Sequence, residues 1–135
     1  MRVQWATLAR YAEAEAETGL MTLVGAGTEV FRMRSLPDRL ATYLALQLRD
    51  AEAEADHEYL ATFTVRDPDL QPIGRSLEVR FAPTLNPLHA PGWEAFFSIA
   101  GALSFAVGAA GTYSIGIDVA GAHAAEIPFR IAELD

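Results

Sequence analysis

Alternation of apolar and polar residues along most of the chain constrains the fold more than any other feature. In the segment 40–49, leucine or threonine occupies every second position, and mostly smaller or polar residues lie between them. Successive side chains of a β-strand point to opposite faces, so this period marks strands with one buried face. The same period recurs at 59–66, 76–81, 93–99, 113–119 and 127–131. These segments predict a chain built of strands.

The N-terminal third follows the period less closely. Val3, Trp5 and Thr7 suggest a strand, but Leu8 breaks its phase, and a β-bulge would restore it. The stretch 20–33 resembles a strand interrupted by Gly25 and Gly27. Counted together, these segments give about eight strands.

Clusters of glycine, proline and aspartate separate the predicted strands and indicate tight turns. We therefore expect an all-β single domain over 1–135. Its fold would be an antiparallel two-sheet β-sandwich of about eight strands, Greek-key and immunoglobulin-like. One short helix near residues 50–57 is an open alternative to a loop, because alanine and glutamate favour helices. Pro128 cannot donate to a sheet, so its strand is expected at an edge or bulged there.

The uncharged segment 95–117 is long enough to cross a bilayer as a helix. Four glycines and the strand period at its end instead favour two buried strands, so we expect no membrane contact. The start, MRVQWATLARYAE, has no apolar signal region, which predicts an unexported, cytoplasmic protein.

The stretch AAGTYSIGI places Gly111 two residues before Tyr113 at the entry to a predicted strand. This arrangement is similar to the tyrosine corner of Greek-key sandwiches, in which the phenol bonds back to the chain. The alternative is that Tyr113 is one more aromatic residue of the core.

The chain also resembles a family of small bacterial proteins of unknown function. The motifs that carry the resemblance are Tyr11-Ala12-Glu13, Gly19-Leu20, Gly111-Thr112-Tyr113 and Ile127-Pro128-Phe129-Arg130. The resemblance implies a β-sandwich and brings no assigned catalytic residues.

Charge is distributed unevenly along the chain. The formal net charge is −8 and all ten basic residues are arginine, which argues against nucleic-acid binding. If the strands alternate in direction, the connections 12–19, 50–58, 82–92 and 120–123 share one end of the molecule. Eight of the eighteen acidic residues then lie in the first two connections. They are Glu13, Glu15, Glu17, Asp50, Glu52, Glu54, Asp56 and Glu58.

The three histidines fall in the other connections expected at this end or in 50–58: His57 lies in 50–58, His89 in 82–92 and His123 in 120–123. Their shared end raises the question of a metal site. His57, His89 and His123, helped by Asp56 or Glu58, have the chemistry of a divalent metal site. Their spacing matches no metal-binding signature, and histidines beside acids are common in solvated loops, which is the explanation we prefer. We therefore expect no cofactor, and disulfides are excluded because the chain has no cysteine.

Trp93 follows the proline-rich loop and is a candidate for stacking on a small ligand such as a sugar. The alternative is a core tryptophan at a strand start.

No nucleophile motif such as G-x-S-x-G occurs, so we expect no enzyme. The sequence predicts a non-catalytic interaction or assembly module, most simply a homodimer through an edge strand or sheet face. Tyr43, Leu60 and Phe96 point outward in the predicted strands and either supply contact area or face a second layer. The alternative function is binding of a small ligand or metal at the acidic, histidine-bearing end.

Overall fold

The computed structural model describes residues 1–50, 57–83 and 93–134, and this part of the chain is all-β. Its ten strands are β1 (Arg2–Ala9), β2 (Tyr11–Ala14), β3 (Met21–Val24), β4 (Val30–Met33), β5 (Asp38–Asp50), β6 (Tyr59–Arg66), β7 (Leu77–Phe81), β8 (Ala95–Val107), β9 (Gly111–Val119) and β10 (Ala122–Glu133). Among these residues, no helix is long and apolar enough to cross a membrane. The uncharged segment 95–117 forms β8 and most of β9.

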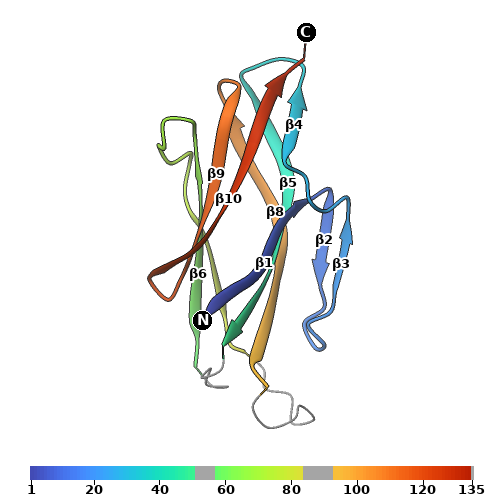
Figure 1. The fold of residues 1–135 in the computed structure, drawn as a ribbon, viewed down its shortest axis with the longest axis vertical. Coiled ribbons are helices and arrows are strands. Elements are labelled where there is room, and N and C mark those ends of the chain that lie inside the picture. Colours follow the sequence, from blue (N-terminus) through green and yellow to red (C-terminus); the bar gives the residue numbers. More distant parts are fainter. Residues whose placement is uncertain (51–56, 84–92, 135) are drawn as a thin grey trace.

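The strands form three sheets, where two had been expected (Figure 1). One sheet has the order β1-β5-β8, and the second has the order β4-β10-β9-β6-β7. Strands β2 and β3 make a separate two-stranded hairpin. The prediction of eight strands in two sheets is therefore wrong in number, although the all-β class is confirmed.

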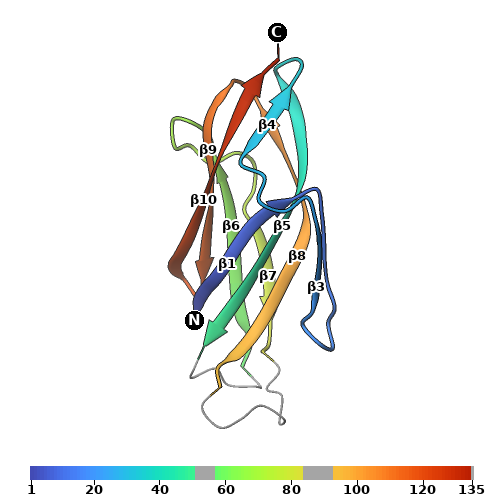
Figure 2. The ribbon, with the colours of Figure 1, turned by 45° about the vertical axis from the view of Figure 1, so that its right-hand side comes forward.

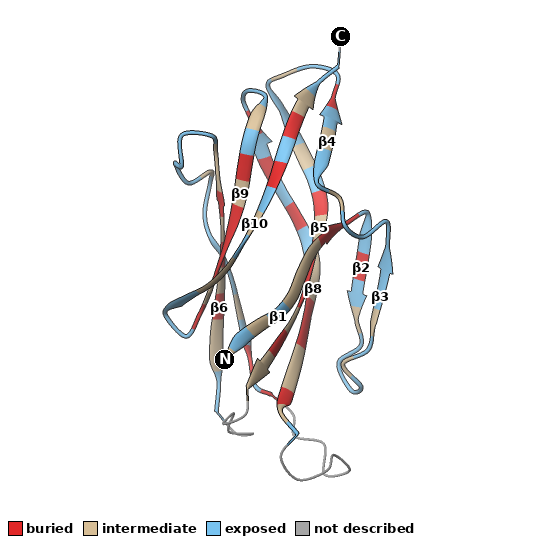
Figure 3. Ribbon diagram, viewed as in Figure 1, coloured by how far each residue is buried: buried red, intermediate tan, exposed pale blue. Residues whose placement is uncertain are grey.

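The core lies between the three-stranded and five-stranded sheets, and Figure 3 shows buried and accessible positions alternating along these strands. The alternation that the sequence predicts at 40–49 is borne out by Leu44, Leu46 and Leu48, which are almost fully buried. Each of the long strands contributes one face in this way. The largest fully buried side chains are Phe63, Phe129, Leu8, Leu46, Leu48, Ile115, Ile117, Ile131 and Val107.

Strand β1 contains the bulge that its sequence required, but at a different place. Its pairing with β5 shifts register between Val3 and Trp5, where Gln4 is the extra residue. After this shift, Leu8 faces the main core, while Trp5 packs on the opposite face of the sheet. A bulge thus reconciles the two phases within one strand.

The stretch 20–33 is two strands, and they belong to different sheets. β3 pairs with β2, whereas β4 pairs in parallel with the end of β10. Gly25 and Gly27 have φ angles of 63° and 85°, so the chain turns between the two strands. The expectation of a purely antiparallel fold is wrong here, because a hydrophobic period of two is the same for both strand directions.

The β2–β3 hairpin covers part of the outer face of the three-stranded sheet (Figure 2). Ala9, Ala12 and Ala45 are buried between them. The Ser98 hydroxyl on β8 donates to the carbonyl oxygen of Gly19 at 2.7 Å and ties the hairpin turn to the sheet. Because small alanine side chains allow close approach, the hairpin forms a second layer on this face.

The chain crosses from the three-stranded to the five-stranded sheet between β8 and β9. Tyr113 is 2% exposed, and its hydroxyl donates to the carbonyl oxygen of Ala109 at 2.6 Å. This is the bond that defines a tyrosine corner, made by a ring that also belongs to the core. Gly111 has a φ of 149°, and a Cβ atom there would lie 2.7 Å from Cγ of Pro68. The crossover therefore needs glycine.

Two further expectations concern single positions. Pro128 pairs with Ser114 of β9, while pairing with β4 begins only at Arg130, so β10 is locally an edge at the proline. The short helix expected near 50–57 falls largely on residues 51–56, which lie outside the described residues. Asp50, the first residue of the expected range 50–57, is the last residue of β5.

Candidate functional site

The acidic end predicted from the sequence is the lower end of the molecule in Figure 1. The β2–β3 turn, the end of β5 and the start of β6 all point there. His57 and His123 are both exposed. The His57 ring packs edge-on against Tyr59, with 4.6 Å between ring centroids, and Nδ1 of His123 lies 3.1 Å from Asp118. His57 therefore contacts a residue two positions away along the chain, and His123 contacts its cross-strand partner in the β9–β10 hairpin.

The structure does not bring the metal-ligand candidates together. Within the described ranges, no three histidine, aspartate or glutamate side chains are close enough to hold a metal ion. Glu58 pairs with Arg80 at 3.3 Å, whereas Asp56 and His89 lie outside the described residues. A metal site at this end stays a prediction from the sequence.

Cations neutralise part of the charge at this end. The amino group of Met1 lies 3.5 Å from Asp50. Arg2 donates a hydrogen bond to the Glu94 carboxylate, and this bond lowers the pKa of Glu94 and raises the pKa of Arg2. Two carboxylates at this end, Asp50 and Glu94, are therefore paired with cations from the start of the chain, far from them in sequence.

Trp93 is 66% exposed, so it is not a core residue. It precedes β8, next to Glu94. An accessible indole could still stack on a sugar ring. Ligand binding by Trp93 stays a prediction from the sequence.

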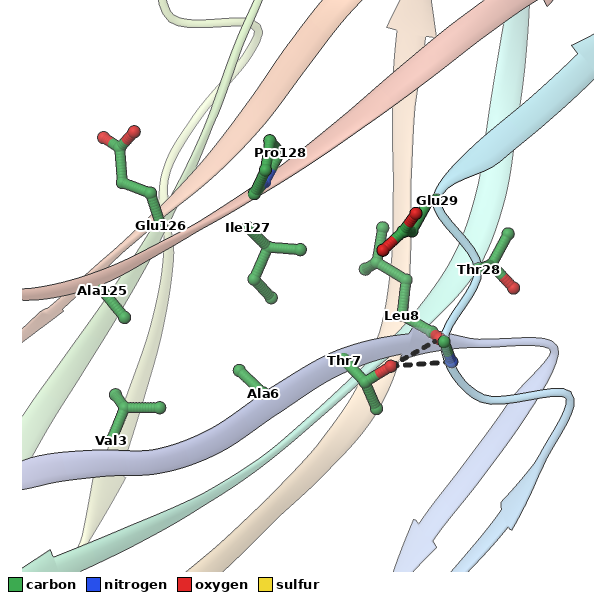
Figure 4. Close-up of a pocket in the computed structure, with 11 residues that line it drawn as sticks. Val3, Ala6, Thr7, Leu8, Thr28, Glu29, Ala125, Glu126, Ile127 and Pro128 are labelled. Atoms are coloured by element: carbon green, nitrogen blue, oxygen red, sulfur yellow. Dashed lines mark hydrogen bonds between the residues drawn. The ribbon is translucent and has the colours of Figure 1, made fainter.

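A groove of about 410 Å³ lies where the edges of the two main sheets approach each other (Figure 4). Val3, Ala6 and Leu8 on β1 point into it from one side, and Ile127 on β10 points into it from the other. The connector 27–29 closes one end of the groove. The groove thus follows the open edge that Pro128 leaves on β10.

The lining of this groove is polar and apolar in similar measure. The Thr7 hydroxyl is already engaged, because it accepts from the N–H of Gly27 at 2.8 Å and donates to the carbonyl oxygen of Leu8 at 3.1 Å. Glu126 points away from Ile127 and lies 3.7 Å from Arg66. The groove offers packing surface and no nucleophile paired with a base.

The β2–β3 hairpin carries the densest exposed apolar surface of the described residues. Nine large apolar side chains are exposed in this part of the chain, and four of them lie on residues 11–24. They are Tyr11 at 40%, Leu20 at 67%, Leu23 at 36% and Val24 at 50% exposure. We call these four residues the hairpin surface.

Sequence reasoning missed the hairpin surface and chose Tyr43, Leu60 and Phe96 as outward apolar residues. The hairpin itself covers two of these: the Tyr43 ring packs 5.2 Å from Tyr11, and Phe96 lies directly beneath Gly19. Leu60 is half-buried on β6. The uncharged run LMTLV at 20–24 was the available signal, but an apolar run does not reveal whether another element covers it.

Comparison with known proteins gives a family and no activity. Residues 4–132 match a family described as "Family of unknown function (DUF6941)". No curated protein matches the chain. The expected resemblance to proteins of unknown function is thereby confirmed.

Proposed function

The chain belongs to this family of unknown function, and we propose from its geometry that it is a non-catalytic assembly module that forms a homodimer. The observation that carries the proposal is the hairpin surface. An exposed apolar edge strand is a template for pairing with another chain, and natural proteins usually protect such edges with charge, proline or bulges. The four residues of β3 include none of these.

Two hydrogen bonds that anchor the hairpin to the sheet support the same proposal. Ser98 holds its turn, and the Thr42 hydroxyl donates to the carbonyl oxygen of Ala9, just before β2, at 3.0 Å. A preorganised edge loses little conformational entropy on binding, so a short strand retains more of its contact energy.

A second copy of the chain is the simplest partner for this surface. Two-fold homodimers are the commonest assemblies, and they place the same patch of both copies in contact. The hairpin surface is uncharged at 20–24, so two copies meet there without like-charge repulsion. A cytoplasmic location and ligand binding at the acidic end stay predictions from the sequence.

Sedimentation velocity over a range of concentrations tests the proposal. β3 has only four residues, so the contact is small and we expect dissociation on the order of 10 µM. Leu23→Glu places a charge at the apolar edge and should leave only monomer. Leu70→Glu is the matched control, because Leu70 is 71% exposed and lies in the loop between β6 and β7. A wild-type chain that stays monomeric at high concentration, in both low and high salt, refutes the proposal.

A further inference from the structure

Hydrogen bonding within the hairpin determines which backbone groups of β3 face outward. The N–H of Glu15 donates to the carbonyl oxygen of Leu20 at 2.8 Å, and Glu13 pairs with Thr22 two positions further along. Hydrogen-bonded and non-hydrogen-bonded pairs alternate in an antiparallel ladder. Leu20 and Thr22 therefore direct their backbone groups toward β2. Met21 and Leu23 direct theirs to the outer edge.

These outward groups restrict how two β3 strands can pair with each other. If Met21 lies opposite Leu23 of the second copy, both outward residues of each strand form hydrogen-bonded pairs, giving four bonds around the axis. Placing Met21 or Leu23 opposite itself gives only one such pair within β3, with two bonds. Resting on the proposed homodimer, we propose that two copies pair antiparallel through β3, with Thr22 on the two-fold axis.

The side chains of 20–24 match in the same register. The sequence Leu-Met-Thr-Leu-Val has apolar residues on both sides of its central threonine. About a two-fold axis at Thr22, Leu20 lies opposite Val24 of the second copy, and Met21 lies opposite Leu23 of the second copy. Leu20 and Val24 are 67% and 50% exposed in the isolated chain, so each gains an apolar neighbour. A register shifted by one step of the ladder would place Leu20 or Val24 opposite the threonine.

Charge also favours the antiparallel arrangement. The β2–β3 turn carries Glu15 and Glu17, whereas Arg10 runs across Gly25 at the other end of β3. Antiparallel pairing places the acidic turn of one copy beside Arg10 of the other. A parallel arrangement would place the two acidic turns side by side, where like charges repel.

Single cysteines test the register directly, because the natural chain contains none. Thr22→Cys puts two thiols on the axis in a non-hydrogen-bonded pair, where the Cα atoms are about 4.5 Å apart and a disulfide can form. We expect Thr22→Cys to cross-link to a dimer under mild oxidation, and Met21→Cys and Leu23→Cys to cross-link much less. Leu70→Cys, which is highly exposed and far from the hairpin, measures cross-linking by random collision. Circular dichroism of each reduced variant checks that the fold is retained.

The outcomes separate the register from the homodimer itself. Preferential cross-linking of Met21→Cys or Leu23→Cys overturns the register while leaving a dimer through β3. Cross-linking of all three at the level of Leu70→Cys, with a dimer still present in sedimentation, overturns pairing through β3 altogether. A monomer in sedimentation removes the proposed function as well.

Hydrogen exchange of the wild-type chain tests the same register without substitution. As the concentration rises through the dimer midpoint, the amides of Met21 and Leu23 should exchange more slowly, in proportion to the dimer fraction. The amide of Thr22 already bonds to β2 and should change less. Equal slowing at all three, or slowing at none, contradicts the proposed pairing.

Discussion

Tyr113→Phe removes one oxygen atom from the crossover between the two main sheets. The ring stays in place, because it stacks on Phe129 with 5.7 Å between centroids and is buried in the core. Only the 2.6 Å hydrogen bond to the carbonyl oxygen of Ala109 is lost. The substitution therefore measures that bond, with little change in packing.

The magnitude follows from the surroundings of the two partners. A hydrogen bond contributes about 0.5–1.5 kcal/mol net, and a buried partner left unsatisfied costs about 1–3 kcal/mol. Ala109 is an exposed residue, so water can replace the phenol at its carbonyl oxygen, and we expect a loss of about 1–2 kcal/mol. At about 2.1 cal/mol/K per residue, 135 residues give an unfolding entropy near 0.28 kcal/mol/K. The expected fall in Tm is therefore about 4–7 °C.

Calorimetry at one low chain concentration checks this value, with Tyr11→Phe as control. Tyr11 is 40% exposed, and its hydroxyl donates to Glu13 at 3.0 Å in solvent, so the same chemical change there should lower Tm much less. If Tyr113→Phe lowers Tm no more than Tyr11→Phe does, the crossover bond makes no net contribution and the reasoning fails.

Two further predictions concern other contacts. Gly111→Ala should lower the free energy of unfolding in urea by about 1–3 kcal/mol, because of its φ and the approach of Pro68, whereas Gly108→Ala, with open space around it, should not. Arg2→Gln should raise the pKa of Glu94 toward its usual value in an NMR titration. A carboxyl whose pKa is lowered by folding stabilises the fold above its unfolded pKa and loses this contribution as pH falls through the folded pKa. An unchanged Glu94 titration in the variant would show that Arg2 is not the cause.

Much of the fold could be predicted from period-two hydrophobicity. β5 and β6 bury one face along most of their length. The spacing of Leu46, Leu48 and Phe63 in the sequence is therefore enough to predict that they are buried. The direction in which two strands pair cannot be predicted in this way, because the hydrophobic period is the same for parallel and antiparallel strands. The parallel pairing of β4 with β10 is set by the turn at Gly25 and Gly27 and by which sheet has an open edge, and neither follows from local spacing.

The candidate site was harder to predict for a related reason. His57 and His123 were expected at one end of the molecule, but connections that share an end need not bring their side chains within contact distance. The hairpin surface exists because no other described element packs over Leu20 and Val24. Which element packs over a given side chain is decided by the tertiary structure. A sequence pattern reports what a side chain is suited to, and only the fold decides which side chains remain accessible.

The parallel seam between β4 and β10 has a kinetic consequence. Val30 pairs with Arg130, one hundred positions further along the chain, whereas β2 and β3 need only a short turn to meet. Closing so long a stretch of chain carries a large entropic cost, so contacts of this kind raise contact order and slow folding. During synthesis, β4 emerges from the ribosome long before its neighbour exists and waits with an unpaired edge.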